Sequence, residues 1–314
     1  MPLGKTNTVP NEAEAPSRVG ASNNLKTGES NLSALERRHF AWRLGVKSAP
    51  RVAALPASLL ADDWHSRTTP PSPQSTSSAV KGESLSDSVR ALACYADVVV
   101  LRHPIKGSAS EAAAACPVPL LNAGDGIGEH PTQALLDLAT IRGELGSVVG
   151  KRVVLVGDLK HGRTVHSLSR LLAASGAASV TYVAPPELSM PPELRSALSA
   201  AGLAQSDASD LLSAVAVADV VYVTRVQKER FTDVSDYERL KSAFVLTPAH
   251  LAAMPTASIV MHPLPRVGEI DPACDADPRA AYFRQMKYGL LVRMALLALV
   301  LGITLEQLEA ECKE

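Results

Sequence analysis

Several features that would point to a specialised class of protein are scarce in this sequence. Aromatic residues make up only 4% of the 314 residues, and the formal net charge is −1. A charge so near zero provides no general attraction for nucleic acids or anionic membranes. The four cysteines, Cys94, Cys116, Cys274 and Cys312, lie far apart without metal-ligand or redox spacing. They predict free thiols in a reducing compartment and no metal site.

Long apolar runs are lacking as well. The longest one, LLVRMALLALVLG, includes Arg293 and is too short to span a bilayer, so it predicts a buried helix. The first residues do not show the charged-then-apolar pattern of a secretory signal. We therefore expect a cytoplasmic protein that has neither a membrane nor a nucleic acid as its partner.

The character of the sequence changes at about residue 76. Residues 1–76 are rich in Pro, Ser, Thr and Asn, as in TNTVPNEAEAPS and TTPPSPQSTSS, and no strand-like run stands out among them. We expect this region to be atypical and partly disordered. From Ser77 onward, apolar runs of strand length alternate with helical patterns. This alternation predicts an α/β fold with parallel sheets.

The expected elements place polar groups at one edge of such sheets. Strands are expected at 97–103, 118–124, 152–158, 179–185, 218–226 and 257–265, and helices at 85–95, 132–145, 163–175, 192–201, 247–253 and around 290–301. Most of these strands are followed by cationic or amide side chains: Arg102 and His103, then His130 and Gln133, then Lys160, His161 and Arg163, then Arg225, Gln227, Lys228 and Arg230, and finally His262 and Arg266. Ligands of open α/β sheets bind at the carboxyl ends of the strands.

Each of these clusters also has a simpler interpretation. A single Arg after a strand is commonly a solvated loop residue, and a His-Pro pair commonly marks a turn. The run VVLVGDLKHGR could begin a dinucleotide site, but no G-x-G-x-x-G follows that strand. The run KERFTDVSDYERLK could be a solvated, charge-rich helix. Because independent loops seldom all offer anion-binding groups, the clusters together predict a crevice that holds anions.

Six motifs in a fixed order give the sequence a family resemblance. They are KGESLSD, LRHP, GDGIGEHPTQALLD, GDLKHGRTVHSL, YVTRVQKERF and MHPLPRVGEI. From Ser77 to Gly302 the sequence resembles the aspartate carbamoyltransferase family, in particular the version within eukaryotic pyrimidine multienzymes. The ornithine-using sister family usually has a cysteine where Thr132 stands and lacks TRVQKER. The resemblance implies an enzyme of de novo pyrimidine biosynthesis that transfers the carbamoyl group of carbamoyl phosphate to L-aspartate.

The resemblance also implies an organisation into two domains, each a mainly parallel sheet flanked by helices. Residues 77–146 and 288–314 would form a carbamoyl-phosphate-binding domain, which would be incomplete, and residues 147–287 an aspartate-binding domain. A homotrimer with active sites shared between subunits is implied as well. The family reaction needs no metal and no cofactor, because it proceeds by holding two anions in the right geometry.

The family pattern assigns roles to individual residues. Arg102 and His130 would be catalytic, since fixed donors stabilise the negative charge that develops on the carbonyl oxygen. Carbamoyl phosphate would be bound by Ser77, Lys81, Arg102, His130, Gln133 and Leu264, and aspartate by Lys81, Arg163, Arg225, Gln227 and Pro265. Arginines suit a dicarboxylate because a guanidinium binds a carboxylate bidentately. Arg230 would organise its loop rather than contact substrate.

One family motif is missing. Ahead of KGES the family has a strand that ends in Ser-Thr-Arg-Thr and opens a helix whose N-terminus holds the phosphate. The nearest stretch here is HSRTTPP at 65–71, where Pro70 and Pro71 would block a helix and no apolar strand is evident beforehand. The alternative function is therefore a catalytically impaired homologue, or a non-catalytic trimer-forming subunit, that lacks the phosphate loop.

Overall fold

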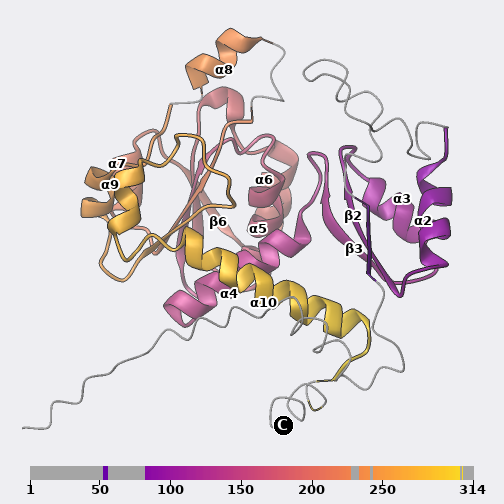
Figure 1. The fold of residues 1–314 in the computed structure, drawn as a ribbon. Coiled ribbons are helices and arrows are strands. Elements are labelled where there is room, and N and C mark those ends of the chain that lie inside the picture. The colour runs from indigo at the N-terminus through magenta and orange to yellow at the C-terminus, as the bar shows by residue number, and fades with distance from the viewer. Residues whose placement is uncertain (1–51, 56–81, 228–232, 241–242, 305, 307–314) are drawn as a thin grey trace, which may run out of the picture. The chain divides into compact units, whose positions relative to one another are not determined.

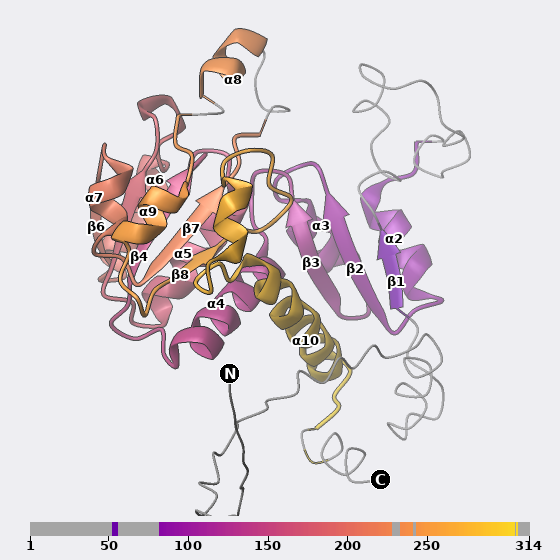
Figure 2. The ribbon, with the colours of Figure 1, turned by 60° about the vertical axis from the view of Figure 1, so that its left-hand side comes forward.

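A computed structural model describes residues 52–55, 82–227, 233–240, 243–304 and 306. These residues form a three-stranded sheet and a five-stranded sheet, both flanked by helices (Figures 1 and 2). Every pair of neighbouring strands runs parallel. The predicted α/β fold with mainly parallel sheets is therefore confirmed.

The three-stranded sheet has the strand order β1-β2-β3. Its strands are β1 (Val52–Leu55), β2 (Val98–His103) and β3 (Leu120–Asp125). Helices α2 (Leu85–Ala93) and α3 (Ser108–Ala115) pack on β2 and on each other (Figure 1). The buried cluster between them consists of Val89, Leu101, Ala109 and Ala112. Val98 and Val99 of β2 are fully buried as well, so the buried side chains of this sheet are mostly valines and alanines.

Strand β1 contradicts the expectation that no strand lies within residues 1–76. It pairs in parallel with β2, with Leu55 opposite Leu101. Its four residues, VAAL, stand between Arg51 and Pro56 and form too short an apolar run to be recognised by pattern alone. Because β1 and β2 are parallel, the chain leaves β1 at the edge of the sheet where β2 ends. The rest of residues 1–76 lies outside the described part of the chain.

The five-stranded sheet has the order β6-β5-β4-β7-β8. Its strands are β4 (Arg152–Gly157), β5 (Ser179–Val183), β6 (Ala204–Asp207), β7 (Val220–Thr224) and β8 (Ile259–Met261). In β4, Val153 and Leu155 belong to one buried cluster, whereas Val154 and Val156 belong to another. The central strands are therefore buried on both faces, which is why they form continuous apolar runs in the sequence.

Helices cover both faces of this sheet (Figure 2). One cluster includes residues of α4 (Pro131–Leu145), α5 (Arg163–Ala174) and α6 (Pro192–Ala200). The other includes residues of α7 (Leu211–Val215) and α9 (Pro248–Ala253). The remaining helices are α8 (Val234–Leu240), two short 3₁₀ turns at Pro186–Leu188 and Pro272–Ala276, and α10 (Tyr282–Val300). The sequence patterns did not predict α3 or α7.

Helix α10 is longer than predicted and packs along α4 (Figure 1). It begins at Tyr282 rather than near residue 290, so the predicted division between 287 and 288 falls within one continuous helix. A Cβ atom on Gly143 of α4 would lie 2.4 Å from the Tyr288 hydroxyl oxygen, so the glycine lets the Tyr288 side chain lie close against α4. Arg284 adds an ion pair with Glu144, with a shortest N–O distance of 2.7 Å.

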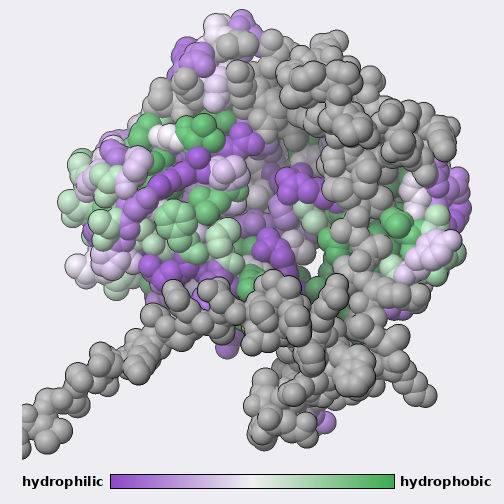
Figure 3. Space-filling view, in the orientation of Figure 1, coloured by the Kyte–Doolittle hydropathy of each residue, from purple (hydrophilic) through white to green (hydrophobic). Residues whose placement is uncertain are grey.

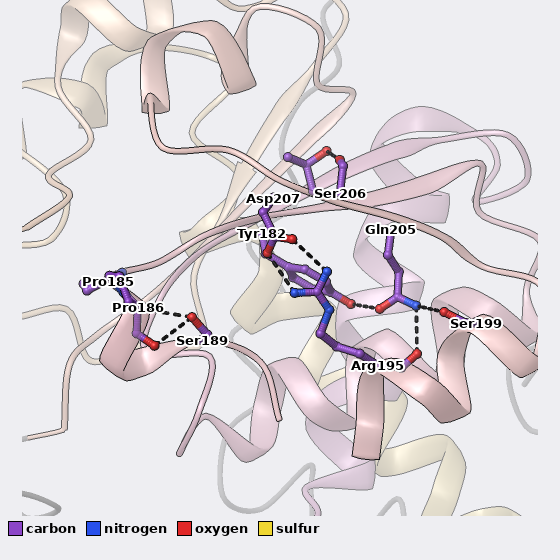
Figure 4. A network of polar contacts seen from close by, with 10 residues as sticks. Tyr182, Pro185, Pro186, Ser189, Arg195, Ser199, Gln205, Ser206 and Asp207 are labelled. Atoms are coloured by element: carbon purple, nitrogen blue, oxygen red, sulfur yellow. Dashed lines mark hydrogen bonds and ion pairs between the residues drawn. The ribbon is translucent and has the colours of Figure 1, made fainter. Parts of the chain in front are cut away.

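Strand β6 was not predicted, because its sequence AQSD is polar. The Tyr182 hydroxyl of β5 donates to Gln205 Oε1 over 2.6 Å, and Gln205 Nε2 donates to the Arg195 carbonyl over 2.9 Å (Figure 4). Arg195 also forms a bidentate pair with Asp207, at 2.9 and 2.7 Å (Figure 4). Polar side chains thus attach this outer strand where apolar burial is absent.

The described surface mixes polar and apolar residues. On the face in Figure 3, hydrophilic and hydrophobic residues are interspersed over the described helices and strands. Among the helices that the structure describes, none is both long enough and apolar enough to cross a membrane. The longest of them, α10, includes Arg284, Lys287 and Arg293.

Candidate active site

The predicted site residues follow the carboxyl ends of strands from both sheets. Arg102 lies in β2, His130 and Gln133 at the start of α4, Arg163 at the start of α5, Arg225 and Gln227 after β7, and Leu264 and Pro265 after β8. The other predicted ligands, Ser77 and Lys81, lie outside the described residues, as do Lys228 and Arg230.

The turn between β3 and α4 is shaped by Asp125 and by a glycine. The buried Asp125 carboxylate accepts the backbone N–H of Gly107 over 2.8 Å and that of Glu129 over 2.7 Å. Gly126 has φ +56°, and a Cβ atom there would lie 2.3 Å from the Pro104 carbonyl oxygen. Only glycine fits that position. The turn can therefore fold back onto the end of β2 and present His130 beside it.

His130 is the N-cap residue of α4, and Pro131 occupies the first helical position. Proline suits this position because the N–H that it lacks would have no partner within the helix. The backbone N–H of His130 itself donates to Ser167 Oγ of α5 over 2.9 Å. Ser167 Oγ in turn donates to the carboxylate of Glu129, which also pairs with Arg170 at 3.1 Å. Helix α5 thus holds the start of α4 in place.

The electrostatic surroundings keep the His130 ring neutral. Burial, and after it the positive charges of Arg163, Arg102 and Arg293, lower the pKa of His130 to about 3. The imidazole is therefore uncharged near neutral pH. The Thr132 hydroxyl oxygen lies 3.4 Å from His130 Nδ1. In the tautomer in which Nδ1 accepts a hydrogen bond from this hydroxyl, the ring hydrogen is on Nε2, which is then a neutral hydrogen-bond donor.

Arg163 connects the start of α5 to the turn before α4. Its Nη1 donates to the Gly126 carbonyl over 2.9 Å, and a Cβ atom on Gly124 would lie 2.8 Å from its Cζ. The turn that leads to Arg163 is also constrained, because a Cβ atom on Gly162 would lie 2.4 Å from the Asp158 carbonyl oxygen. The guanidinium therefore lies against the glycine-rich turn that precedes His130, where its charge acts on that ring.

The ends of β4 and β7 approach each other closely. A Cβ atom on Gly157 would lie only 2.0 Å from the Thr224 carbonyl oxygen. Past the end of β7, Gln227 Nε2 donates to the His161 carbonyl over 3.2 Å, and Arg225 is half-buried. The structure thus brings the segment of Arg225 and Gln227 to the turn before Arg163.

Gln133 is held by a carboxylate that the sequence patterns did not single out. Asp137, fully buried one turn further along α4, accepts Gln133 Nε2 over 2.9 Å. It also accepts Gln285 Nε2 of α10 over 2.6 Å and the Tyr222 hydroxyl of β7 over 2.9 Å. Burial raises the pKa of Asp137 to about 7, although these three hydrogen bonds and the charge of Arg293 lower it.

The turn after β8 is fixed by the buried His262. Its backbone N–H donates to Gln285 Oε1 over 2.9 Å, and its Nδ1 accepts the Leu264 backbone N–H over 2.8 Å. Its Nε2 lies 2.6 Å from Glu269 Oε1. Burial alone would raise the pKa of Glu269, but hydrogen bonds from His262 and from the Val267 backbone lower it below its usual value. Leu264 has φ +41°, and the Leu264–Pro265 bond is cis.

Sequence reasoning missed most of the residues that support the site. Glu129 and Asp137 lie within the motif GDGIGEHPTQALLD, so their acidic side chains beside His130 and Gln133 were a usable signal. Ser167 and Gln285 gave none, because they meet the site only through the packing of α5 and α10. Among the described residues, no group of three or more His, Cys, Asp or Glu side chains could hold a metal ion.

Comparisons with known proteins agree with this arrangement. The family model for the aspartate/ornithine carbamoyltransferase Asp/Orn binding domain matches residues 149–300. The model for the carbamoyl-P binding domain of the same family matches residues 65–143, so the match includes HSRTTPP. The chain is 48% identical over 229 residues to the aspartate carbamoyltransferase catalytic subunit of Methanocella arvoryzae, covering 73% of this chain and 74% of that protein.

Larger proteins and solved structures are also similar to the chain. It is 53% identical over 227 residues to the multifunctional protein pyr1-3 of Dictyostelium discoideum, covering 72% of this chain but only 10% of that protein. The chain thus spans about a tenth of the length of such multifunctional relatives.

The structure of Trypanosoma cruzi aspartate transcarbamoylase in complex with carbamoyl phosphate superposes with a TM-score of 0.67, at 45% identity, covering 73% of each chain. The catalytic subunit of M. jannaschii aspartate transcarbamoylase gives a TM-score of 0.66 at 44% identity, covering 72% of this chain and 74% of that one. The family models, the relatives and the fold coincide with the sequence motifs, and the chain belongs to the aspartate carbamoyltransferase family.

Proposed function

We propose that this chain is an aspartate carbamoyltransferase. The amino nitrogen of L-aspartate attacks the carbonyl carbon of carbamoyl phosphate, and the carbonyl oxygen becomes an oxyanion. Collapse of this intermediate breaks the C–O bond to the phosphorus-bearing oxygen, and phosphate leaves with the electron pair. Loss of a proton from the nitrogen then gives N-carbamoyl-L-aspartate.

The neutral His130 ring among arginines is the observation that carries this proposal. A ring held uncharged by burial and by Arg163, Arg102 and Arg293 can donate a hydrogen bond without needing to gain a proton. Such a donor stabilises a carbonyl oxygen more strongly as its negative charge grows. The same arginines favour an anionic ligand, which carbamoyl phosphate supplies. His130 and Arg102 therefore take the catalytic roles.

The proposed carbamoyl contacts follow from the orientation of two groups. Gln133 Nε2 is engaged by Asp137, so its Oε1 is the end of the amide that can accept the carbamoyl NH2. Leu264 would offer its backbone carbonyl to the same nitrogen. Ser77 and Lys81, outside the described residues, complete the proposed phosphate contacts. The T. cruzi relative was solved with carbamoyl phosphate and aspartate together, which supports this pair of substrates.

The aspartate contacts lie around the ends of β4 and β7. Arg163 and Arg225 would each bind a carboxylate, and Gln227 and Pro265 would border the same substrate. The exposed Pro265 and the half-buried Arg225 stand on the turn and the segment that follow neighbouring strands of one sheet. Lys81 would add a positive charge from a neighbouring subunit in a homotrimer with shared sites. A cytoplasmic location belongs to the same proposal.

The alternative function is an impaired homologue or a non-catalytic trimer-forming subunit. One observation favours it: no Ser-Thr-Arg-Thr occurs in the sequence ahead of KGES. Without that loop, several charge-assisted hydrogen bonds to phosphate are lost, each worth roughly 1.5–3 kcal/mol. Strand β1 changes one premise, however, because a strand does precede HSRTTPP, and it ends at the same edge as β2.

A steady-state assay of the purified full chain separates these functions. Formation of carbamoyl-aspartate from carbamoyl phosphate and L-aspartate, but not of citrulline from L-ornithine, is expected for the proposed enzyme. Absence of turnover by a folded protein would support the alternative. In that case, inserting a Ser-Thr-Arg-Thr-helix segment ahead of Ser77 should raise the rate by several orders of magnitude, at about 1.4 kcal/mol per factor of ten.

A further inference from the structure

Asp137 is a fully buried carboxylate for which neither the sequence motifs nor the proposed reaction provides a role. Burying a charge costs free energy unless it is well hydrogen-bonded. Its three donors come from three elements, namely Gln133 of α4, Gln285 of α10 and Tyr222 of β7. A carboxylate that only stabilised α4 would not need hydrogen-bond donors from α10 and β7.

The charge of Asp137 determines which way two amides point. An ionised carboxylate only accepts hydrogen bonds, so both Gln133 and Gln285 must turn their NH2 groups toward Asp137 Oδ1. Their carbonyl oxygens then point away from it. For Gln285 this oxygen accepts the His262 backbone N–H over 2.9 Å. For Gln133 it becomes the acceptor offered to the substrate.

The same contacts form one chain of hydrogen bonds between two proposed substrate ligands. It runs from Gln133 to Asp137, on to Gln285, then to the backbone N–H of His262, and from His262 Nδ1 to the backbone N–H of Leu264. Its two ends are the Gln133 amide and the Leu264 turn, both proposed to contact the carbamoyl NH2. These groups come from α4, from α10 and from the turn after β8, which are far apart in the sequence.

We propose that Asp137 is a positioning residue that fixes the direction of the Gln133 amide and aligns it with the Leu264 turn. This rests on the proposed function, because it specifies how that site recognises the carbamoyl group. The role predicts an effect on the carbamoyl end of the ligand and none on its phosphate end.

If Asp137 positions Gln133 through its charge, the reaction rate depends on the pH at which Asp137 ionises. The groups that face it are Gln133, Tyr222, Gln285 and the positively charged Arg293 of α10, and its pKa of about 7 reflects burial against their opposing effects. Protonation would give the carboxyl group a hydrogen to donate, so the two amides would no longer be forced to face it with their NH2 groups. The rate should therefore fall as the pH decreases through about 7.

Asp137→Asn in the full chain tests the inference, because asparagine has the same shape but carries a donor. We expect kcat/KM for carbamoyl phosphate to fall about tenfold to a hundredfold at pH 8, with KM for aspartate changed less than about twofold. The fall in rate below about pH 7 should be absent in this variant. Thr140→Val is the matched control: Thr140 is equally buried on α4, but its hydroxyl donates only to the Leu136 carbonyl. The control should keep both the rate and the pH profile of the unaltered chain.

Calorimetric titration separates failure of this role from failure of the proposed function. The unaltered chain should bind carbamoyl phosphate more tightly than inorganic phosphate, and Asp137→Asn should lose that preference while still binding phosphate. A preference fully retained by Asp137→Asn would overturn the positioning role alone. An unaltered chain without turnover and without any such preference would overturn the proposed function.

Gln285→Leu decides the matter if Asp137→Asn does not fold, as checked by circular dichroism. This variant keeps the bond between Gln133 and Asp137 but cuts the chain of hydrogen bonds toward His262. A smaller loss, about threefold to tenfold, is expected in kcat/KM for carbamoyl phosphate, again without a change in phosphate binding. An equal loss for both ligands, or no loss for either, would count against the proposed alignment.

Discussion

The five-stranded and the three-stranded sheets differ in what holds them and in what positions their functional groups. Helices cover both faces of the larger sheet, and its two clusters contain large buried side chains such as Tyr222 and Tyr282. The described core of the smaller sheet is built from smaller side chains, chiefly valines and alanines together with Leu101. The comparison suggests that the smaller sheet alone is a poor support for a precise site.

The groups next to the smaller sheet that we propose to bind anions are held from outside it. The His130 backbone is bound by Ser167 of α5, and Arg163 of α5 lies against the turn of Gly126. Gln133 is fixed through Asp137, which is held in turn by Gln285 of α10. The geometry of the proposed carbamoyl contacts therefore depends on helices whose main packing is with α4 and the larger sheet.

The largest expected effect is a loss of aspartate use without a loss of phosphate binding. Arg225→Ala should lower kcat/KM for aspartate about a thousandfold, roughly 4 kcal/mol, because a guanidinium that binds a carboxylate bidentately is lost. Binding of inorganic phosphate, measured by calorimetry, should stay nearly unchanged. Arg239→Ala is the control, since that exposed side chain pairs with Glu187 on the surface, and it should change the rate less than about twofold. Equal loss of both ligands would contradict the assignment of Arg225.

Packing of the larger sheet can be broken at one glycine. Gly157→Ala should lower the free energy of unfolding by about 3 kcal/mol or more, because its Cβ would lie 2.0 Å from the Thr224 carbonyl oxygen. Gly146→Ala is the matched control, with φ +76° and no atom within 4 Å of its Cβ. It should cost only about 1 kcal/mol, from the backbone conformation. Urea unfolding measures both, and similar losses would show that the clash with the Thr224 carbonyl oxygen is relieved at little cost.

The role of His130 is tested by steady-state kinetics. His130→Ala should lower kcat about a hundredfold, roughly 2.7 kcal/mol, while KM for either substrate changes less than about threefold. The reason is that its hydrogen bond strengthens as the carbonyl oxygen becomes an oxyanion. His250→Ala provides a control, because His250 bonds to Thr247 at the start of α9 and should leave kcat unchanged. A raised KM with an unaltered kcat would show that His130 only binds substrate.

His130 should also make the protein sensitive to acid. The unfolded chain binds a proton at this ring as the pH falls through about 6.5, whereas the folded protein does so only near a pKa of about 3. Acidification within this window therefore favours unfolding, by about 2 kcal/mol at pH 5. His130→Asn should abolish this part of the loss when unfolding free energies at pH 7 and pH 5 are compared. A variant whose loss between the two pH values equals that of the unaltered chain would refute the effect.

The smallest expected effect concerns the outer strand of the larger sheet. Gln205→Ala should lower the unfolding free energy by about 1 kcal/mol, because the Tyr182 hydroxyl loses its acceptor. Thr181→Val, which removes the exposed pair between Thr181 and Ser206, should cost less than about 0.5 kcal/mol. Thermal unfolding measures the two variants side by side. If they cost the same, the network of Figure 4 does not hold β6 in place.

The predicted elements were most accurate where each strand is buried on both faces. The expected strand at 152–158 is observed at Arg152–Gly157, and the expected helix at 163–175 at Arg163–Ala174. The misses have separate physical causes. Strand β6 has Ala204 as its one apolar residue, β1 is only four residues long, and the alanine-rich α3 has almost no amphipathic pattern. Periodicity cannot reveal an element that is stabilised mainly by its neighbours.

By itself the sequence determined the α/β class, the family and the set of cationic and amide side chains after the strands. These features follow from local patterns of apolar residues and from motifs contiguous in the chain. Only the tertiary structure decided the charge of His130, the direction of the Gln133 amide and the presence of β1 beside β2. The reason is that burial and hydrogen-bond partners set these properties, and the partners come from distant segments. Gln285 reaches Asp137 across 148 positions of the chain, a separation at which no sequence pattern connects two residues.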